Sequence, residues 1–217
     1  MQMKWILLSA VLIVAGVAVA FVALAPAVTP AGIAGDGEAA AGDAFMLANQ
    51  SGIALSLYDS ALAMDADNPS FLKKKGEALI RSGKTDEAGQ IYRQLYARNA
   101  NDTAVVIRMG DFRYWQGDYA GAIAYYDTAL ALQPDNAKTW LRQGDAYLLL
   151  AVGEYHEQHA VFLDSLDTYR KAMDDYAKAQ KFDPRLSAVV SARTLAADQF
   201  QANGNEQGMI ASLRASA

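Results

Sequence analysis

The sequence predicts an all-α protein in which antiparallel helix pairs stack as a solenoid, with one membrane-spanning helix at the N-terminus. Two observations predict this architecture. Small and aromatic residues recur every 34 residues through most of the chain, and an uncharged apolar segment runs from Trp5 to Ala25. One pair of short helices cannot bury its apolar face alone, so neighbouring pairs must stack.

The N-terminal segment is long enough to cross a bilayer. As a helix rising about 1.5 Å per residue, Trp5–Ala25 spans roughly 31 Å, the thickness of one hydrocarbon core. Lys4 precedes it and the next basic residue is Lys73. This charge asymmetry predicts a cytoplasmic N-terminus and an extracytoplasmic remainder.

We therefore expect a single-pass transmembrane signal-anchor over residues 1–25, followed by an Ala/Pro/Gly tether over residues 26–34. A cleaved signal peptide is the alternative, because Ala18 and Ala20 fit a cleavage site. In that case the protein is secreted or periplasmic.

The 34-residue period is carried by three residue types. The recurring positions are Gly42, Gly76, Gly110 and Gly144; Ala54, Ala88 and Ala122; and Tyr58, Tyr92 and Tyr126. A period of 34 with this pattern resembles the tetratricopeptide repeat. Trp140, Gly144 and Tyr147 match its first helix, and Ala122, Tyr126, Ala129 and Pro134 match its second. The resemblance implies a right-handed α-solenoid over about residues 35–217.

The period divides the chain into four repeats and a C-terminal capping segment. The repeats are 35–68, 69–102, 103–136 and 137–186, and the capping helices occupy 187–217. In the fourth repeat the alanine–tyrosine pair expected at positions 156 and 160 falls at Ala172 and Tyr176, sixteen residues late. We expect both helices of this repeat to run on by about two turns, as an extended helical hairpin.

The resemblance also implies a ligand-binding concave face lined by the first helix of each repeat. Mapped onto this chain, its candidate protein-binding residues are the acidic Asp43, Glu77, Asp111 and Asp145 and the apolar Ile107, Tyr114, Leu141 and Leu148. A partner that offers apolar side chains with Lys or Arg would fit this set. Alternatively, the acidic side chains are solvated or locally hydrogen-bonded.

The extended hairpin is the competing protein-binding surface, with Tyr155, His156, His159, Phe162 and Leu166 as its candidate residues. Two histidines three apart share a helix face, so a metal-dependent role is a further alternative. The spacing differs from the zincin motif, and we assign the histidines to the polar tip of the hairpin, with no metal site.

The composition narrows the function. The chain has 217 residues, a net charge of −5 and no cysteine, which excludes disulfides and thiolate metal ligands. An acidic balance argues against nucleic acid. With no catalytic motif, we expect neither an enzyme nor a cofactor nor a small-molecule substrate. The sequence predicts a membrane-anchored scaffold that binds membrane or envelope proteins during assembly or stabilisation of an envelope complex. The alternative is a permanent accessory subunit of a membrane complex.

Overall fold

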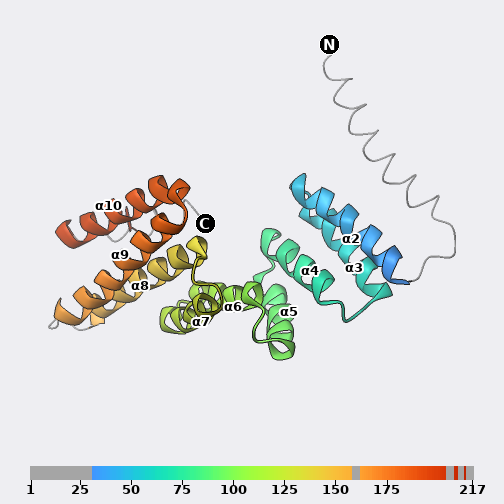
Figure 1. Ribbon diagram of the computed structural model, residues 1–217, viewed down its shortest axis with the longest axis horizontal. Helices are drawn as coiled ribbons and strands as arrows, with labels where there is room; N and C mark the ends of the chain where they lie inside the picture. Colours follow the sequence, from blue (N-terminus) through green and yellow to red (C-terminus); the bar gives the residue numbers. More distant parts are fainter. Residues whose placement is uncertain (1–30, 158–161, 204–207, 210–212, 214–217) are drawn as a thin grey trace, which may run out of the picture. The chain divides into compact units, whose positions relative to one another are not determined.

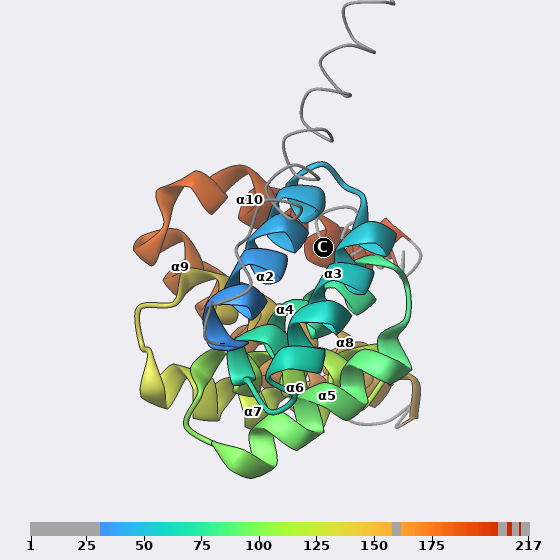
Figure 2. The same cartoon turned by 90° about the vertical axis from the view of Figure 1, so that its right-hand side faces the viewer.

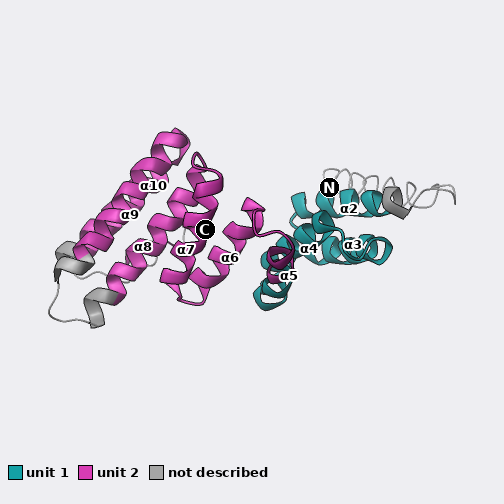
Figure 3. Ribbon diagram, turned by 60° about the horizontal axis from the view of Figure 1, so that its bottom comes forward, with its two compact units in different colours: residues 1–91 teal, residues 92–217 magenta. Residues whose placement is uncertain are grey.

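The computed structural model describes residues 31–157, 162–203, 208–209 and 213, and the elements in these ranges are all helical. The predicted signal-anchor, residues 1–25, lies outside the described residues. No helix in the described ranges is long and apolar enough to cross a membrane. The chain divides into two compact units, residues 1–91 and 92–217 (Figure 3).

Unit 1 contains α2 (Ala31–Leu47), α3 (Ser51–Met64), α4 (Pro69–Arg81) and the first half of α5 (Thr85–Arg98). Figures 1 and 2 show α2 and α3 side by side. Small and aromatic side chains of α2, α3 and α4 form one buried cluster, which contains Ala39, Met46, Ala54, Tyr58, Ala61, Phe71 and Ala78. Because α2 begins at Ala31, the last four residues of the predicted tether are helical, and that boundary was wrong.

Unit 2 contains the rest of α5, then α6 (Thr103–Trp115), α7 (Tyr119–Leu132), α8 (Ala137–Glu157), α9 (Phe162–Phe182), a 3-10 turn (Pro184–Leu186) and α10 (Ser187–Asn203). The α8–α9 pair supplies the largest core, which also includes Val190, Ala197, Met209 and Leu213. Helices α8 and α9 are each 21 residues long, whereas α6 has 13 and α7 has 14. Each helix of this pair is therefore about two turns longer than its counterpart in the preceding pair.

Polar caps set the start of α4, α6 and α8. The side chains of Asn68, Asp102 and Asn136, spaced by 34 residues, accept hydrogen bonds from backbone N–H groups of α4, α6 and α8. Such caps satisfy amides that a helix start leaves without partners. The helices they begin coincide with the predicted repeat starts at 69, 103 and 137.

Each recurring glycine leaves room for the ring of a recurring tyrosine. A Cβ on Gly110 would lie 2.6 Å from Cε1 of Tyr126, and one on Gly144 would lie 2.7 Å from Cε1 of Tyr176. Gly42 has the same relation to Tyr58, at 2.5 Å. The glycine therefore lets the two helices of one repeat approach until the ring covers the glycine backbone.

Trp140 and Tyr147 lie at the edge of the α8–α9 core. Both are partly buried and pack against it. Lys178 and Lys171, both on α9, lie 4.1 Å and 5.6 Å from the centres of these rings, which places each aromatic face beside the hydrated surface of the hairpin.

Candidate functional site

The tyrosine that covers each glycine also binds a carboxylate. The hydroxyl of Tyr58 donates to Asp43 at 2.8 Å, that of Tyr126 donates to Asp111 at 2.9 Å, and that of Tyr176 donates to Asp145 at 2.8 Å. Each bond joins the second helix of a repeat to its first helix. Burial, supported by the neighbouring carboxylate, raises the pKa of all three tyrosines, so the hydroxyls remain protonated donors.

A basic residue from the following helix pair completes each arrangement. Lys74 pairs with Asp43, and Arg142 Nε lies 3.1 Å from Asp111 Oδ1. Asp111 also accepts from Arg108 of its own helix, with 2.8 Å between Nη1 and Oδ2. These pairs connect neighbouring repeats within each unit.

The last arrangement is the most enclosed. Arg193 of α10 reaches Asp145 with Nε at 2.5 Å from Oδ1 and Nη2 at 2.8 Å from Oδ2. The two residues are 2% and 8% exposed. Burial raises the pKa of Asp145, and the Arg193 guanidinium and the Tyr176 hydroxyl oppose that shift. Such a pair costs most when one partner is removed, because the other charge is then buried alone.

Four of the eight predicted concave binding residues are buried. Asp111 is 5% exposed and, like Asp145, is occupied by internal partners. Leu141 and Leu148 are 9% and 1% exposed because both belong to the α8–α9 core. A partner cannot reach these four side chains without unpacking the repeat.

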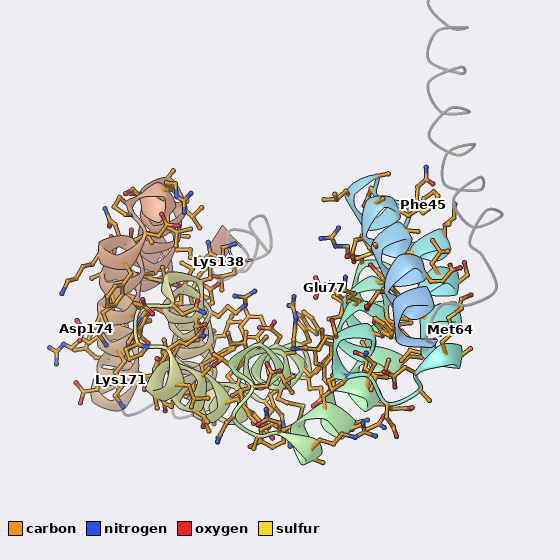
Figure 4. The ribbon with its side chains drawn as sticks, turned by 45° about the vertical axis from the view of Figure 1, so that its right-hand side comes forward. Phe45, Met64, Glu77, Lys138, Lys171 and Asp174 are labelled. Carbon is orange, nitrogen blue, oxygen red and sulfur yellow. The ribbon has the colours of Figure 1, made fainter. Side chains whose placement is uncertain are left out.

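The other four predicted residues retain exposure. Ile107 and Tyr114 on α6 are half-buried. In unit 1, Asp43 keeps 47% of its side chain exposed beside Lys74, and the half-buried Glu77 projects from α4 (Figure 4). Whether these residues bind a partner stays a prediction.

Sequence reasoning missed the cations that flank the carboxylates. Lys74, Arg108 and Arg142 are themselves 34 residues apart, which is the sequence pattern that identifies them. Their side chains are 31%, 24% and 35% exposed. In unit 2, the charge that solvent meets on the first helices is therefore positive, while the negative charge of Asp111 lies beneath.

A second polar cluster lies where α7, α8 and α9 meet. Gln143, 2% exposed, donates to Asp127 at 2.7 Å, and Asp175, 4% exposed, accepts from Lys178 at 3.1 Å. Among the described residues, nothing donates to the buried Oδ2 of Asp175. Burial raises the pKa of Asp175 to about 6, with Lys178 opposing the rise and Asp127 and Asp174 adding to it.

The predicted hairpin site falls mainly on residues whose side chains the structure does not describe. Tyr155, His156, His159 and Phe162 lie among them, and Leu166 is half-buried. The described residues contain no group of three or more His, Cys, Asp or Glu that could hold a metal ion. The hairpin surface therefore stays a prediction.

The described helices, with their repeated glycine–tyrosine–carboxylate arrangement, define a helical-repeat protein. Family models for "Tetratricopeptide repeat" and "TPR repeat" match residues 39–103 and 110–150. Residues 39–103 and 110–150 thus match tetratricopeptide repeats, as the 34-residue period predicted.

Curated relatives match over short stretches. The human protein O-mannosyl-transferase TMTC1 is 31% identical over 87 residues, covering 38% of this chain and 10% of the relative. Rat sperm-associated antigen 1 is 30% identical over 129 residues, covering 56% of this chain and 13% of the relative. The chain thus spans only about a tenth of the length of these relatives.

Solved structures share the fold more completely. A crystal structure of MamA has a TM-score of 0.56 at 17% identity, covering 80% of this chain and 90% of MamA. YrrB, described as a TPR protein with an unusual peptide-binding site, has a TM-score of 0.53 at 19% identity, with 70% of each chain covered. At such identities the likeness shows the fold alone.

Proposed function

We propose that this chain is a non-catalytic, membrane-attached scaffold whose helical repeats bind other proteins. The observation that carries the proposal is the first-helix face of unit 2, which we define as the outward side chains of α6 and α8. Ala104 is exposed there, Ile107 and Tyr114 are half-buried, and Arg108 and Arg142 keep part of their side chains in solvent. A mixture of apolar contact area and oriented charge suits a protein ligand.

YrrB supports the same assignment, because it is a TPR protein of this fold with an unusual peptide-binding site. No comparable support exists for catalysis. The buried acids Asp111 and Asp145 are paired with Tyr and Arg within the repeats, as structural links require.

Membrane attachment is the second part of the proposal, and it rests on the sequence. The uncharged Trp5–Ala25 segment is long enough to span a bilayer, and Lys4 favours a cytoplasmic N-terminus. The repeats would then act outside the cytoplasm, where we place their role in assembling or stabilising an envelope complex.

Site-specific photocrosslinking in living cells tests protein binding. A photoreactive residue replaces Ala104 on the first-helix face, Gly153 on the extended hairpin, or Ala124 on the exposed side of α7; all three positions are solvent-exposed. We expect a discrete crosslinked protein from position 104 and none from position 124. Crosslinking only from position 153 would move the site to the hairpin, and none from any position would refute the proposal.

Turnover of the chain separates a scaffold from a permanent subunit. A scaffold that folds by itself should persist when it is produced in excess of its crosslinked partner. Rapid degradation of the excess would favour the accessory-subunit alternative.

A further inference from the structure

The turn between α2 and α3 carries an Asn-X-Ser sequence, Asn49-Gln50-Ser51. Asn49 has a positive φ of 58°, a conformation that asparagine adopts more readily than most residues. It is exposed, and among the described residues none forms a hydrogen bond with its side-chain amide. The amide nitrogen of Asn49 is therefore accessible from solvent.

Exposed apolar side chains flank Asn49 on both sides. Leu47 is 90% exposed and Ile53 is 46% exposed. Residues 44–57 contain no Asp, Glu, Lys or Arg, so this turn lacks charges of its own that would keep it hydrated. Apolar side chains exposed in this way favour association. A large polar group attached to Asn49 would shield both side chains.

Few side-chain bonds fix the conformation of this turn. Gln50 stands at the N-cap of α3, but its side chain makes no capping hydrogen bond. The hydroxyl of Ser51 lies at the surface, 2.9 Å from the hydroxyl of Ser82. An enzyme can therefore bring the Ser51 hydroxyl close to the Asn49 amide without breaking a helix cap.

A second Asn-X-Ser/Thr sequence, which begins at Asn101, provides an internal comparison. Asn101 is also exposed, but its backbone N–H donates to the side chain of Asn99 at 3.1 Å. The next residue, Asp102, caps α6 by accepting from the N–H of Val105 at 3.3 Å. Its carboxylate also lies next to the acceptor in sequence and would repel a donor that carries phosphate. Both features favour Asn49 over Asn101.

We infer that Asn49 is a site of N-linked glycosylation and that the glycan shields the exposed apolar turn. Asn-X-Ser is an acceptor sequence for this modification, which adds a bulky, solubilising group at a protein surface. The inference rests on the proposed function only for the placement of the repeats outside the cytoplasm.

The donor is an oligosaccharide that a phosphate group joins to a polyprenyl lipid, and the catalyst is an oligosaccharyl transferase. The amide nitrogen of Asn49 forms a bond to the anomeric carbon of the first sugar. The bond between that carbon and the phosphate oxygen breaks, and the lipid phosphate leaves with the electron pair. The nitrogen gives one proton to a base of the transferase, so the product is a neutral glycosyl amide.

The test is mass spectrometry of peptides from the full-length chain, purified from membranes of the cells that produce it naturally. We expect the peptide that contains Asn49 to carry the mass of an oligosaccharide, at higher occupancy than the peptide that contains Asn101. No glycan on Asn49, or occupancy at Asn101 equal to or above that at Asn49, would overturn the inference.

Variants of the turn assign the acceptor. Asn49→Gly removes the amide and keeps the turn, because glycine adopts a positive φ without steric cost. Ser51→Ala keeps Asn49 but removes the hydroxyl, and both variants should lose the glycan mass completely. Ser51→Thr is the matched control and should remain glycosylated. A glycan that persists in Asn49→Gly or in Ser51→Ala would overturn the assignment.

Shielding of the apolar turn has its own readout. In size-exclusion chromatography in mild detergent, the Asn49→Gly chain should shift toward aggregated species relative to the glycosylated parent. Adding Leu47→Gln to that chain should reverse the shift, because the most exposed apolar side chain of the turn is then gone. An unshifted Asn49→Gly chain would refute the shielding role.

The inference and the proposed placement of the repeats fail in different ways. If protease added outside spheroplasts digests the repeats and Asn49 carries no glycan, the placement stands and the glycosylation inference falls. If the repeats are protected from protease and Asn49 carries no glycan, both fall.

Discussion

At the scale of single residues, the repeat is a three-residue device. Gly110 lets the ring of Tyr126 approach, and the ring places its hydroxyl 2.9 Å from Asp111. The same relation holds at Gly144, with Tyr176 and Asp145. The absence of a side chain at the glycine therefore lets the tyrosine reach the carboxylate. A larger residue at the glycine position should weaken that hydrogen bond.

Replacing Gly110 by Ala should destabilise unit 2 although alanine favours helices. The new Cβ would lie 2.6 Å from the Tyr126 ring, and overpacking of this kind costs about 1–3 kcal/mol. Gly153→Ala on α8 is the matched control, because a Cβ there meets nothing within 4 Å. That change should stabilise by about 0.5–1 kcal/mol. Urea unfolding compares the two, and equal effects would contradict the packing argument.

Asp175 should make the stability of unit 2 depend on pH. Its pKa rises from 3.8 to about 6 on folding because the carboxyl is buried. The folded state therefore binds the proton more tightly than the unfolded state. The stability contributed by the protonated form is complete below pH 3.8 and is lost as pH rises through about 6.

Asp175→Asn should remove this dependence. The difference between the two pKa values corresponds to about 3 kcal/mol. The free energy of unfolding of the variant should therefore exceed that of the parent by up to about this amount at pH 8 and by little at pH 4. Loss of the pairing with Lys178 reduces the gain. Asp167→Asn, at an exposed position of the same helix, is the control. Parallel pH–stability curves for parent and Asp175→Asn would refute the assignment.

At the scale of elements, turns and caps decide where helices end. Gly83 and Gly117 close the turns after α4 and α6 with φ of 75° and 79°, a conformation that costs other residues about 1–2 kcal/mol. In the fourth repeat, Ala151 occupies the position of Gly117, so the chain has no glycine at which to turn. Helix α8 continues through it to Glu157, which accounts for the extended hairpin.

Removing the surplus should restore a standard repeat. The design deletes residues 152–167 and adds the substitutions Leu150→Gln, Ala151→Gly and Thr168→Asp. The joined chain then reads Gln-Gly-Asp-Tyr, ending at Tyr169, and so repeats the turn of residues 116–119. The bonds of Asp145 with Tyr176 and Arg193 lie outside the deleted segment. We therefore expect less helical circular dichroism but a preserved cooperative melt.

The plain deletion without the turn substitutions is the control for that design. It places Ala151 where a positive φ is needed, and should melt at lower temperature because the strain costs about 1–2 kcal/mol. Loss of cooperative unfolding in the variant that carries the new turn would show that the extension contributes to the core of the repeat.

The elements were more predictable from sequence than the site. The starts of α4, α6 and α8, and the lengths of α8 and α9, agree with the spacing of glycine, alanine and tyrosine, because packing between helices requires those sizes at those places. Asp111 and Arg142 were harder, since both are polar residues on one helix face. Which of them is buried depends on the Tyr126 hydroxyl, which requires an acceptor inside the repeat, and helical spacing alone does not contain that information.

At the scale of the whole molecule, the links between repeats have defined ends. The first repeat has the exposed Ala40 at the position where later repeats carry Lys74, Arg108 and Arg142. In α10, Leu195 occupies the position of the paired carboxylates and is 59% exposed. Among the described residues, Asp43 is therefore the first acid of this pattern and Arg193 is its last cation.

The N-terminal segment should hold the full-length chain in a membrane with the repeats outside the cytoplasm. Trp5–Ala25 carries no charge, so its insertion is favourable, and Lys4 favours retention of the N-terminus inside. The chain should resist alkaline extraction from membranes, and a variant that begins at Pro26 should not. Protease added outside spheroplasts should digest the repeats. Release of the intact full-length chain by alkali would refute the anchor. A mature chain that lacks the segment would establish cleavage of a signal peptide. Protection of the repeats from protease until the cells are lysed would show the opposite orientation.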